Sequence, residues 1–142
     1  MKKLLFWPVV LLLTACLPEP QPINYGSDQC DFCRMTIVDK KHAAEVVNAK
    51  GKAYKFDAIE CMIQYANIDG AEQFALYLVN DFEMPGEWLD AKTSTFLISQ
   101  NIPSPMGAYL SAFATTEKAK AVQKANKGDL YNWDEIQQKI KR

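Results

Sequence analysis

The first sixteen residues have the pattern of a bacterial lipoprotein signal, which limits what the rest of the chain can fold into. Lys2-Lys3 precedes an apolar run from Leu4 to Leu13 that is too short to cross a bilayer as a helix. Small residues then precede Cys16, as in a lipobox, where a signal peptidase cuts and the thiol receives a lipid. We therefore expect residues 1–15 to be removed and Cys16 to anchor the chain to a bacterial membrane. The rest would face the periplasm or the exterior.

The remaining sequence predicts one small exported domain on a stiff spacer. Residues 16–27 contain alternating prolines, which favour an extended chain, and residues 28–142 suit a single domain or two half-domains sharing a core. Losing Lys2 and Lys3 from the 16 basic side chains leaves 14 against 17 acidic ones, a net charge of −3. This weakly acidic balance argues against nucleic acid as a partner.

Hydrophobic periodicity predicts an α+β fold. In the first half, strands at 43–48 and 52–56 flank a turn ending in Gly51. Asp57 and Glu60 then have capping-box spacing at the start of a helix, and a further β-prone run covers 35–38. The second half has candidate strands at 74–79, 88–91, 95–99 and 109–113 before a helix at about 116–126.

These two halves, about 28–70 and 71–128, are expected to be similar units. Each combines a hairpin with a helix and is too small to bury its own core, so we expect them to pack on one another. Asn132, with Glu135 three residues later, predicts the start of a last amphipathic helix at the C-terminus.

Three cysteines remain once Cys16 is lipidated, and an odd number cannot all pair within the chain. Cys30 and Cys33 have the spacing of half a structural zinc site, of a redox dithiol or of a disulfide. The zinc interpretation also needs Cys61 and the only histidine, His42, which we expect near the surface. The redox interpretation is weaker, because the motif does not stand between a strand and a helix start.

Two methionines favour a soft metal instead. Met35 follows Cys33 by two residues, and in an extended strand both sulfurs would face the same side. Met106 lies between Pro105 and Gly107, which favour a tight, stiff turn that presents its thioether. Thiolate and thioether ligands select Cu(I), although methionine more commonly fills a core. The candidate copper ligands are Cys33 and Met106, with Cys30 and Met35 as additional ones.

The sequence does not predict an enzyme. It has a single histidine, no glycine-rich phosphate loop and no Ser/His/Asp set. Its many carboxylates each have a plausible place at a helix start or on a solvated face.

Four short segments, taken in order, resemble the NosL-type accessory lipoproteins of nitrous oxide reductase. They are Cys33-Arg34-Met35, Phe56 to Met62, Gly86 to Ala91, and Pro105 to Ala108 leading to Ala112-Phe113. The resemblance covers about residues 30–126. In this family the residue between the cysteine and the methionine is often small, whereas here it is Arg34.

The resemblance implies two similar β-β-α-β halves and a Cu(I) chaperone in which Cys33 and Met106 bind the metal. It implies two partners: the apo form of nitrous oxide reductase, whose multicopper centre would receive the copper, and an ABC-type membrane complex. The alternative from a different class is a structural zinc module that scaffolds a membrane-associated complex through Cys30, Cys33, His42 and Cys61. A thiol–disulfide partner protein is a third possibility.

Overall fold

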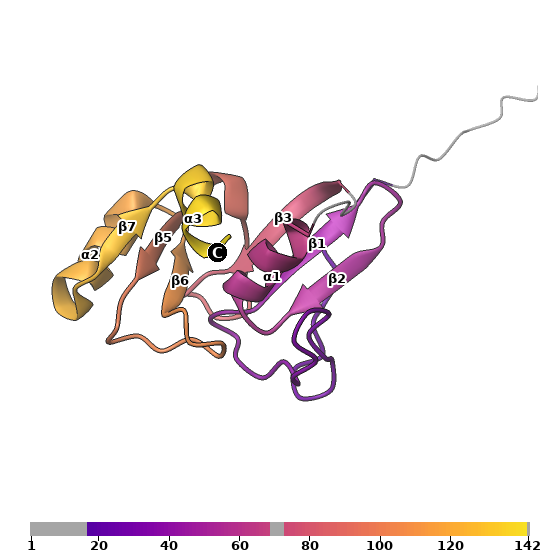
Figure 1. Cartoon of the computed structure of the whole chain (residues 1–142), viewed down its shortest axis with the longest axis horizontal. Coiled ribbons are helices and arrows are strands. Elements are labelled where there is room, and N and C mark those ends of the chain that lie inside the picture. The colour runs from indigo at the N-terminus through magenta and orange to yellow at the C-terminus, as the bar shows by residue number, and fades with distance from the viewer. Residues whose placement is uncertain (1–16, 69–72, 142) are drawn as a thin grey trace, which may run out of the picture.

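The computed structural model describes residues 17–68 and 73–141, which form two antiparallel sheets and three α-helices. Residues 1–15 and the expected lipid site at Cys16 lie outside the described residues. Within the described part of the chain, no helix is both long and apolar enough to cross a membrane. Figure 1 shows the two sheets side by side, with α1 and α3 meeting between them. The α+β class expected from the sequence is confirmed.

The first unit has the order β-β-α-β and gains one edge strand. Its elements are β1 (Ala44–Asn48), β2 (Ala53–Phe56), α1 (Ile59–Ala66), β3 (Phe74–Asn80) and β4 (Trp88–Asp90). The sheet order is β2-β1-β3-β4, with every pair antiparallel. β1 is therefore a central strand, and all five of its residues are buried.

The second unit repeats this order. Its elements are β5 (Thr95–Ile98), β6 (Leu110–Phe113), α2 (Thr116–Asn126) and β7 (Asp129–Tyr131), and its sheet order is β6-β5-β7. The first strand of each unit is thus central in its own sheet. A 3₁₀ turn, η1 (Ala91–Thr93), connects the units, and α3 (Trp133–Ile140) follows the second. The predicted pair of β-β-α-β units with a C-terminal helix is confirmed.

The boundary between the two units lies later in the chain than the expected position between residues 70 and 71. β3 and β4, which the sequence analysis assigned to the second half, belong to the first sheet, where β3 pairs with β1. The second unit begins only with β5, after η1. Strand partnership depends on contacts between distant residues, so local periodicity could not assign β3 to its sheet.

Both units and α3 share one hydrophobic core. It includes Ile59 and Met62 of α1, Phe96 of β5, Leu110 of β6, and Trp133 and Ile136 of α3. A smaller cluster of Leu97, Ile102, Phe113 and Ala119 packs beneath α2. Because α1 and α3 contribute to the same core, each unit buries its apolar face against the other.

The two capping boxes predicted from the sequence have different outcomes in the structure. Asn132 and Glu135 form the predicted capping box of α3. The corresponding box at α1 was wrong: α1 begins after Ala58 without a side-chain cap. Asp57 and Glu60 are both buried, and their carboxylates accept hydrogen bonds from distant segments instead.

Part of the expected spacer lies against the first sheet. Ile23 is buried, and the Lys55 ammonium of β2 donates to the Pro22 carbonyl and to Asp28 at 2.7 Å each. The Gln21 amide donates to Glu45 Oε1 of β1, also at 2.7 Å. The spacer is therefore attached to the domain from Gln21 onward.

Glu45 makes the stability of this region depend on pH. Burial raises the pKa of its carboxyl from 4.5 to about 7, although the Gln21 amide and Lys55 oppose the shift. The unfolded chain releases this proton near pH 4.5 and the folded chain near pH 7, so stability falls as pH rises between these values. We expect Glu45→Gln to stabilise the protein at pH 8 by about 2–3 kcal/mol and to have little effect at pH 4.5.

Chemical denaturation at the two pH values measures this difference. Glu117→Gln is the matched control, because Glu117 is an exposed acid on α2. Equal effects of Glu45→Gln at pH 4.5 and pH 8 would show that Glu45 is not the titrating group.

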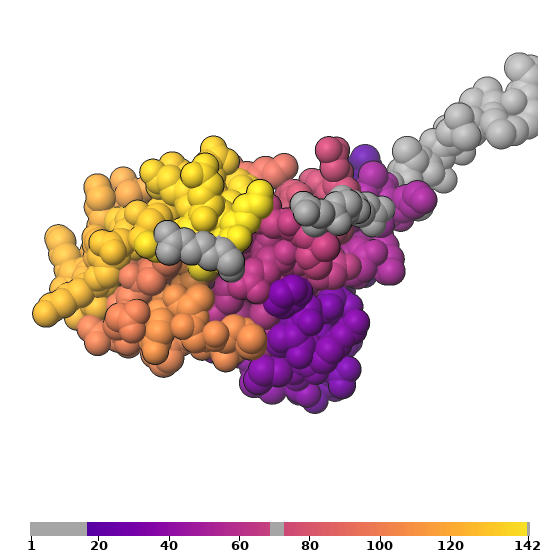
Figure 2. Space-filling model, in the orientation of Figure 1, coloured from indigo at the N-terminus to yellow at the C-terminus, as the bar shows by residue number. Residues whose placement is uncertain are grey.

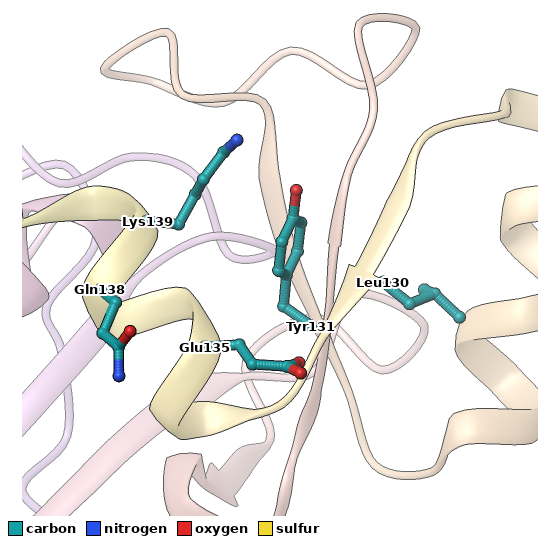
Figure 3. Close-up of a pocket in the computed structure, with 5 residues that line it drawn as sticks. All are labelled: Leu130, Tyr131, Glu135, Gln138 and Lys139. Carbon is teal, nitrogen blue, oxygen red and sulfur yellow. The ribbon is translucent and has the colours of Figure 1, made fainter.

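A pocket of about 390 Å³ lies between β7 and α3 and is lined by Leu130, Tyr131, Glu135, Gln138 and Lys139 (Figure 3). Glu135 is already used in the capping box of α3, and the Lys139 ammonium stands over the Tyr131 ring. Its lining includes neither thiol nor thioether, so this pocket does not have the chemistry of a soft-metal site.

Candidate metal centre

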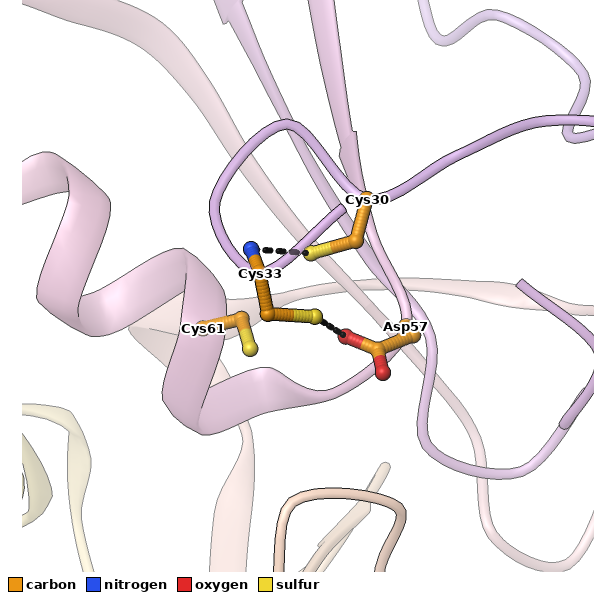
Figure 4. A group of neighbouring side chains, drawn as sticks. All are labelled: Cys30, Cys33, Asp57 and Cys61. Carbon is orange, nitrogen blue, oxygen red and sulfur yellow. Dashed lines mark hydrogen bonds between the residues drawn. The ribbon is translucent and has the colours of Figure 1, made fainter. Parts of the chain in front are cut away.

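Three cysteines and one aspartate meet beside the first sheet. One ligand atom from each of Cys30, Cys33, Asp57 and Cys61 lies within 4.8 Å of all the others. They come from three segments: the turn before β1, the end of β2 and the first turn of α1 (Figure 4).

A tight turn positions the first two cysteines. The Cys30 amide donates to the Met35 carbonyl at 2.8 Å, and the Arg34 amide donates to the Cys30 carbonyl at 3.0 Å. Arg34 has φ 68°, a left-handed conformation that is costly for a residue with a side chain. A small residue, above all glycine, would adopt this conformation more easily.

Asp57 connects this turn to the helix that contains Cys61. The Cys33 thiol donates to Asp57 Oδ1 at 3.4 Å, and the Cys33 amide donates to the Cys30 sulfur, also at 3.4 Å. Asp57 is 2% exposed, and its Oδ2 accepts no hydrogen bond from the described residues. Asp57 therefore adds a buried carboxylate to the three thiols of the cluster.

The three thiols differ in how readily they ionise. Hydrogen bonds from the Cys61 thiol and the Cys33 amide lower the pKa of Cys30 to about 6, although burial opposes the shift. Burial, with hydrogen bonds to Cys30 and Asp57, raises the pKa of Cys33 to about 11. The hydrogen bond to Cys30 and burial raise the pKa of Cys61 as well. These shifts favour ionisation of Cys30 before that of Cys33 or Cys61.

Such a cluster can bind a soft cation with release of protons. The Cys30 thiolate is a ready ligand, and a metal would displace the protons of neighbouring thiols. Cys30 and Cys61 are buried, whereas Cys33 is only partly buried. Cys33 therefore lies on the accessible side.

The comparisons with known proteins identify the family of the chain. The sequence model of the NosL family matches residues 22–141 of the chain. The chain belongs to the NosL family. No curated protein matches it.

A solved structure of the NosL family has the same fold. The crystal structure of the copper chaperone NosL from Shewanella denitrificans superposes with a TM-score of 0.72 at 20% sequence identity. The match covers 83% of this chain and 95% of that one. The family resemblance predicted from short segments is confirmed, and the likeness at this identity concerns the fold.

Of the four ligands predicted from the sequence, the structure places Cys30 and Cys33 in the cluster. Met35 is not in a strand: only Thr36 forms an isolated bridge, with Gln29. The left-handed Arg34 interrupts the extended backbone that would have aligned Cys33 with Met35. Met35 is half-exposed, and its role as a ligand stays a prediction.

Met106 lies in the loop between β5 and β6, and this loop contacts α1. Ser104 Oγ and the Ala108 amide both donate to Glu60 Oε1, at 2.8 and 3.2 Å. Figure 2 shows the orange loop against the indigo and purple N-terminal region. Glu60 directly precedes Cys61, so the Met106 loop of this NosL domain is held at the turn of α1 that also contains Cys61. Met106 is 42% exposed, and its metal contact stays a prediction.

Sequence reasoning gave too little weight to Asp57 and Cys61. Asp57 was interpreted as a helix cap, and Cys61 was named only as a ligand of the zinc alternative. The available signal was a possible capping box followed directly by the third cysteine of an exported chain. Spacing alone could not show that the Asp57 carboxylate turns away from its own helix.

His42 does not join the cysteines, and its expected surface position was wrong. It is 3% exposed, packs against Phe82, and its ring nitrogens contact Asp39 and Ser111 at 2.9 and 3.2 Å. The metal-ligand group among the described residues has Asp57 where the zinc alternative required His42.

Proposed function

We propose that this protein is a copper carrier that binds Cu(I) through Cys33 and the thioether of Met106. Cys30 and Cys61 would supply further sulfur from the buried side. The observation that supports the proposal most is the cluster itself, in which three thiols and a carboxylate approach within 4.8 Å. Thiolate and thioether ligands favour Cu(I) over harder cations.

The position of the ligands suits transfer rather than storage. Cys33 is partly buried and Met106 is 42% exposed, so sulfur ligands of a partner could approach the metal from this side. Exchange would proceed as partner sulfurs replace Met106 and then Cys33. No catalytic step belongs to this proposal.

The partners proposed are the apo form of nitrous oxide reductase, as recipient for its multicopper centre, and an ABC-type membrane complex. A lipid on Cys16 would hold the carrier at the membrane of the cell envelope, on the periplasmic or exterior side. The proline-containing segment before Gln21 is available to separate the domain from that membrane.

A structural zinc site is the second candidate, since three cysteines and one carboxylate are a suitable four-ligand set for zinc. This version uses Asp57 in place of His42. It would place the metal in the buried part of the cluster and would not need Met106.

Anaerobic titration of the domain with Cu(I) and, separately, with Zn(II) tests the two candidates. We expect one tightly held Cu(I) in competition with a chromophoric chelator, and Zn(II) that is readily removed by a chelator. His42→Ala is the control: it should lower stability, because His42 is buried, and leave Cu(I) affinity nearly unchanged. Firm retention of Zn(II), with Cu(I) lost to its competitor, would favour the zinc candidate.

A further inference from the structure

Glu60 is a buried acid that joins the two units. It is 3% exposed and lies in the first turn of α1, where its Oε1 accepts hydrogen bonds from Ser104 and Ala108 of the β5–β6 loop. Ser104 Oγ also accepts a hydrogen bond from the Tyr109 amide at 3.0 Å. One carboxylate oxygen thereby fixes both ends of the segment that contains Met106.

This segment needs such support because its backbone is unfavourable by itself. Gly107 has φ 78° and Tyr109 has φ 57°, and the left-handed conformation is costly for tyrosine. The Gly107 amide donates to the Ser104 carbonyl at 3.0 Å, which closes a turn around Met106. The loop shape thus depends on Ser104, and Ser104 is held by Glu60.

Stability alone does not explain a carboxylate at this position. Glu60 does not cap α1, which begins at Ile59 after Ala58 and has no side-chain cap. Its Oε2 is buried and accepts no hydrogen bond from the described residues, and none of the salt bridges between them includes Glu60. An apolar residue would avoid the cost of burying this group.

We propose that Glu60 is a positioning residue for copper binding. It holds the Met106 loop at the turn of α1 that contains Cys61, so that the thioether from the second unit reaches the metal held by the thiols of the first. The proposal rests on the proposed copper function. Glu60 itself does not contact the metal.

A double-mutant cycle tests the proposal through Cu(I) affinity, measured by anaerobic chelator competition on the folded domain. Glu60→Leu should weaken Cu(I) binding about tenfold in the wild-type background and have no further effect in Met106→Leu. Glu60→Gln keeps the Oε1 acceptor and should retain wild-type affinity. X-ray absorption at the copper edge should show that Glu60→Leu and Met106→Leu lose the same sulfur contribution.

Two controls separate positioning from general loosening. Asn101→Ala removes the side-chain hydrogen bond to the Asn126 carbonyl at the other end of the same loop, and it should not change Cu(I) affinity. Met84→Leu replaces an exposed methionine in a similar Met-Pro-Gly turn and should also be silent. If Glu60→Leu does not fold, Ser104→Ala takes its place in the cycle.

The outcomes are distinguishable. A loss in Glu60→Leu that is equally large in the Met106→Leu background would show an effect on the thiols and overturn the positioning role. Wild-type affinity in Glu60→Leu, or in Met106→Leu while Cys33→Ser is impaired, would overturn it and leave copper binding intact. If Met106→Leu and Cys33→Ser both keep wild-type affinity, the proposed copper function fails as well.

Discussion

Cys33→Ser is expected to weaken Cu(I) binding by about 100-fold or more, the largest loss of affinity from a single substitution. Cys33 is the cluster thiol on the accessible side, within 4.8 Å of the ligand atoms of Cys30 and Cys61. Serine has a similar shape but offers a hard, neutral oxygen in place of a thiolate. Anaerobic competition with a chromophoric chelator measures the change, and thermal unfolding of the metal-free variant checks the fold.

The pH dependence of binding gives a second measurement on the same variant. Burial raises the pKa of Cys33 to about 11, so copper must displace its proton at neutral pH. The Cu(I) affinity of the wild-type protein should therefore increase as pH rises from 6 to 8. In Cys33→Ser the increase should be smaller, because copper binding releases one proton fewer. Unchanged affinity in Cys33→Ser, with a large loss in Cys30→Ser or Cys61→Ser, would place copper in the buried part of the cluster instead.

Gly128→Ala is expected to cost about 3 kcal/mol or more of stability. Gly128 has φ 108° between α2 and β7, and an added Cβ would collide with the Ile98 carbonyl oxygen. It would also approach the Ile98 carbonyl carbon and Ser99 Cα at 3.0 Å each. Ile98 belongs to the central strand of the second sheet, so the obstructing atoms are backbone that cannot move aside. Chemical denaturation measures the loss.

Gly51→Ala is the matched control for this prediction. Gly51 also has positive φ, at 82°, but nothing lies within 4 Å of the position its Cβ would take. Gly51→Ala should therefore lose only about 1 kcal/mol of stability, the cost of the left-handed conformation for alanine. Equal losses in the two variants would mean that the contact with Ile98 relaxes at little cost.

Local sequence patterns were sufficient where the interactions themselves are local. The helix at 116–126 was predicted from its periodicity and the helix after Asn132 from its cap and apolar face, and these signals involve residues within a few positions of one another. The same holds for the hairpin around Gly51, whose turn fixes the pairing of β1 with β2. The pairing of β3 with β1 joins distant residues, and no local signal assigned it.

The two capping-box patterns show where local reasoning stops. Asn132 and Glu135 form the box because α3 begins at the surface, where no other group competes for them. Asp57 and Glu60 have the same spacing, but both are buried, and tertiary packing brings the Cys33 thiol and Ser104 to their carboxylates. A buried acid takes the partners that the fold supplies, because an unpaired one is costly.

The sequence by itself determined the α+β class and the sulfur-rich chemistry, because these follow from residue types and short-range periodicity. Its four short segments also carried the resemblance to the family. Only the tertiary structure decided which of those residues meet. It joined Cys61 and Asp57 to the Cys30–Cys33 turn, turned His42 into the core, and fixed the Met106 loop on Glu60. Contacts across 24 or more residues depend on how whole units pack, and that information is absent from any short segment.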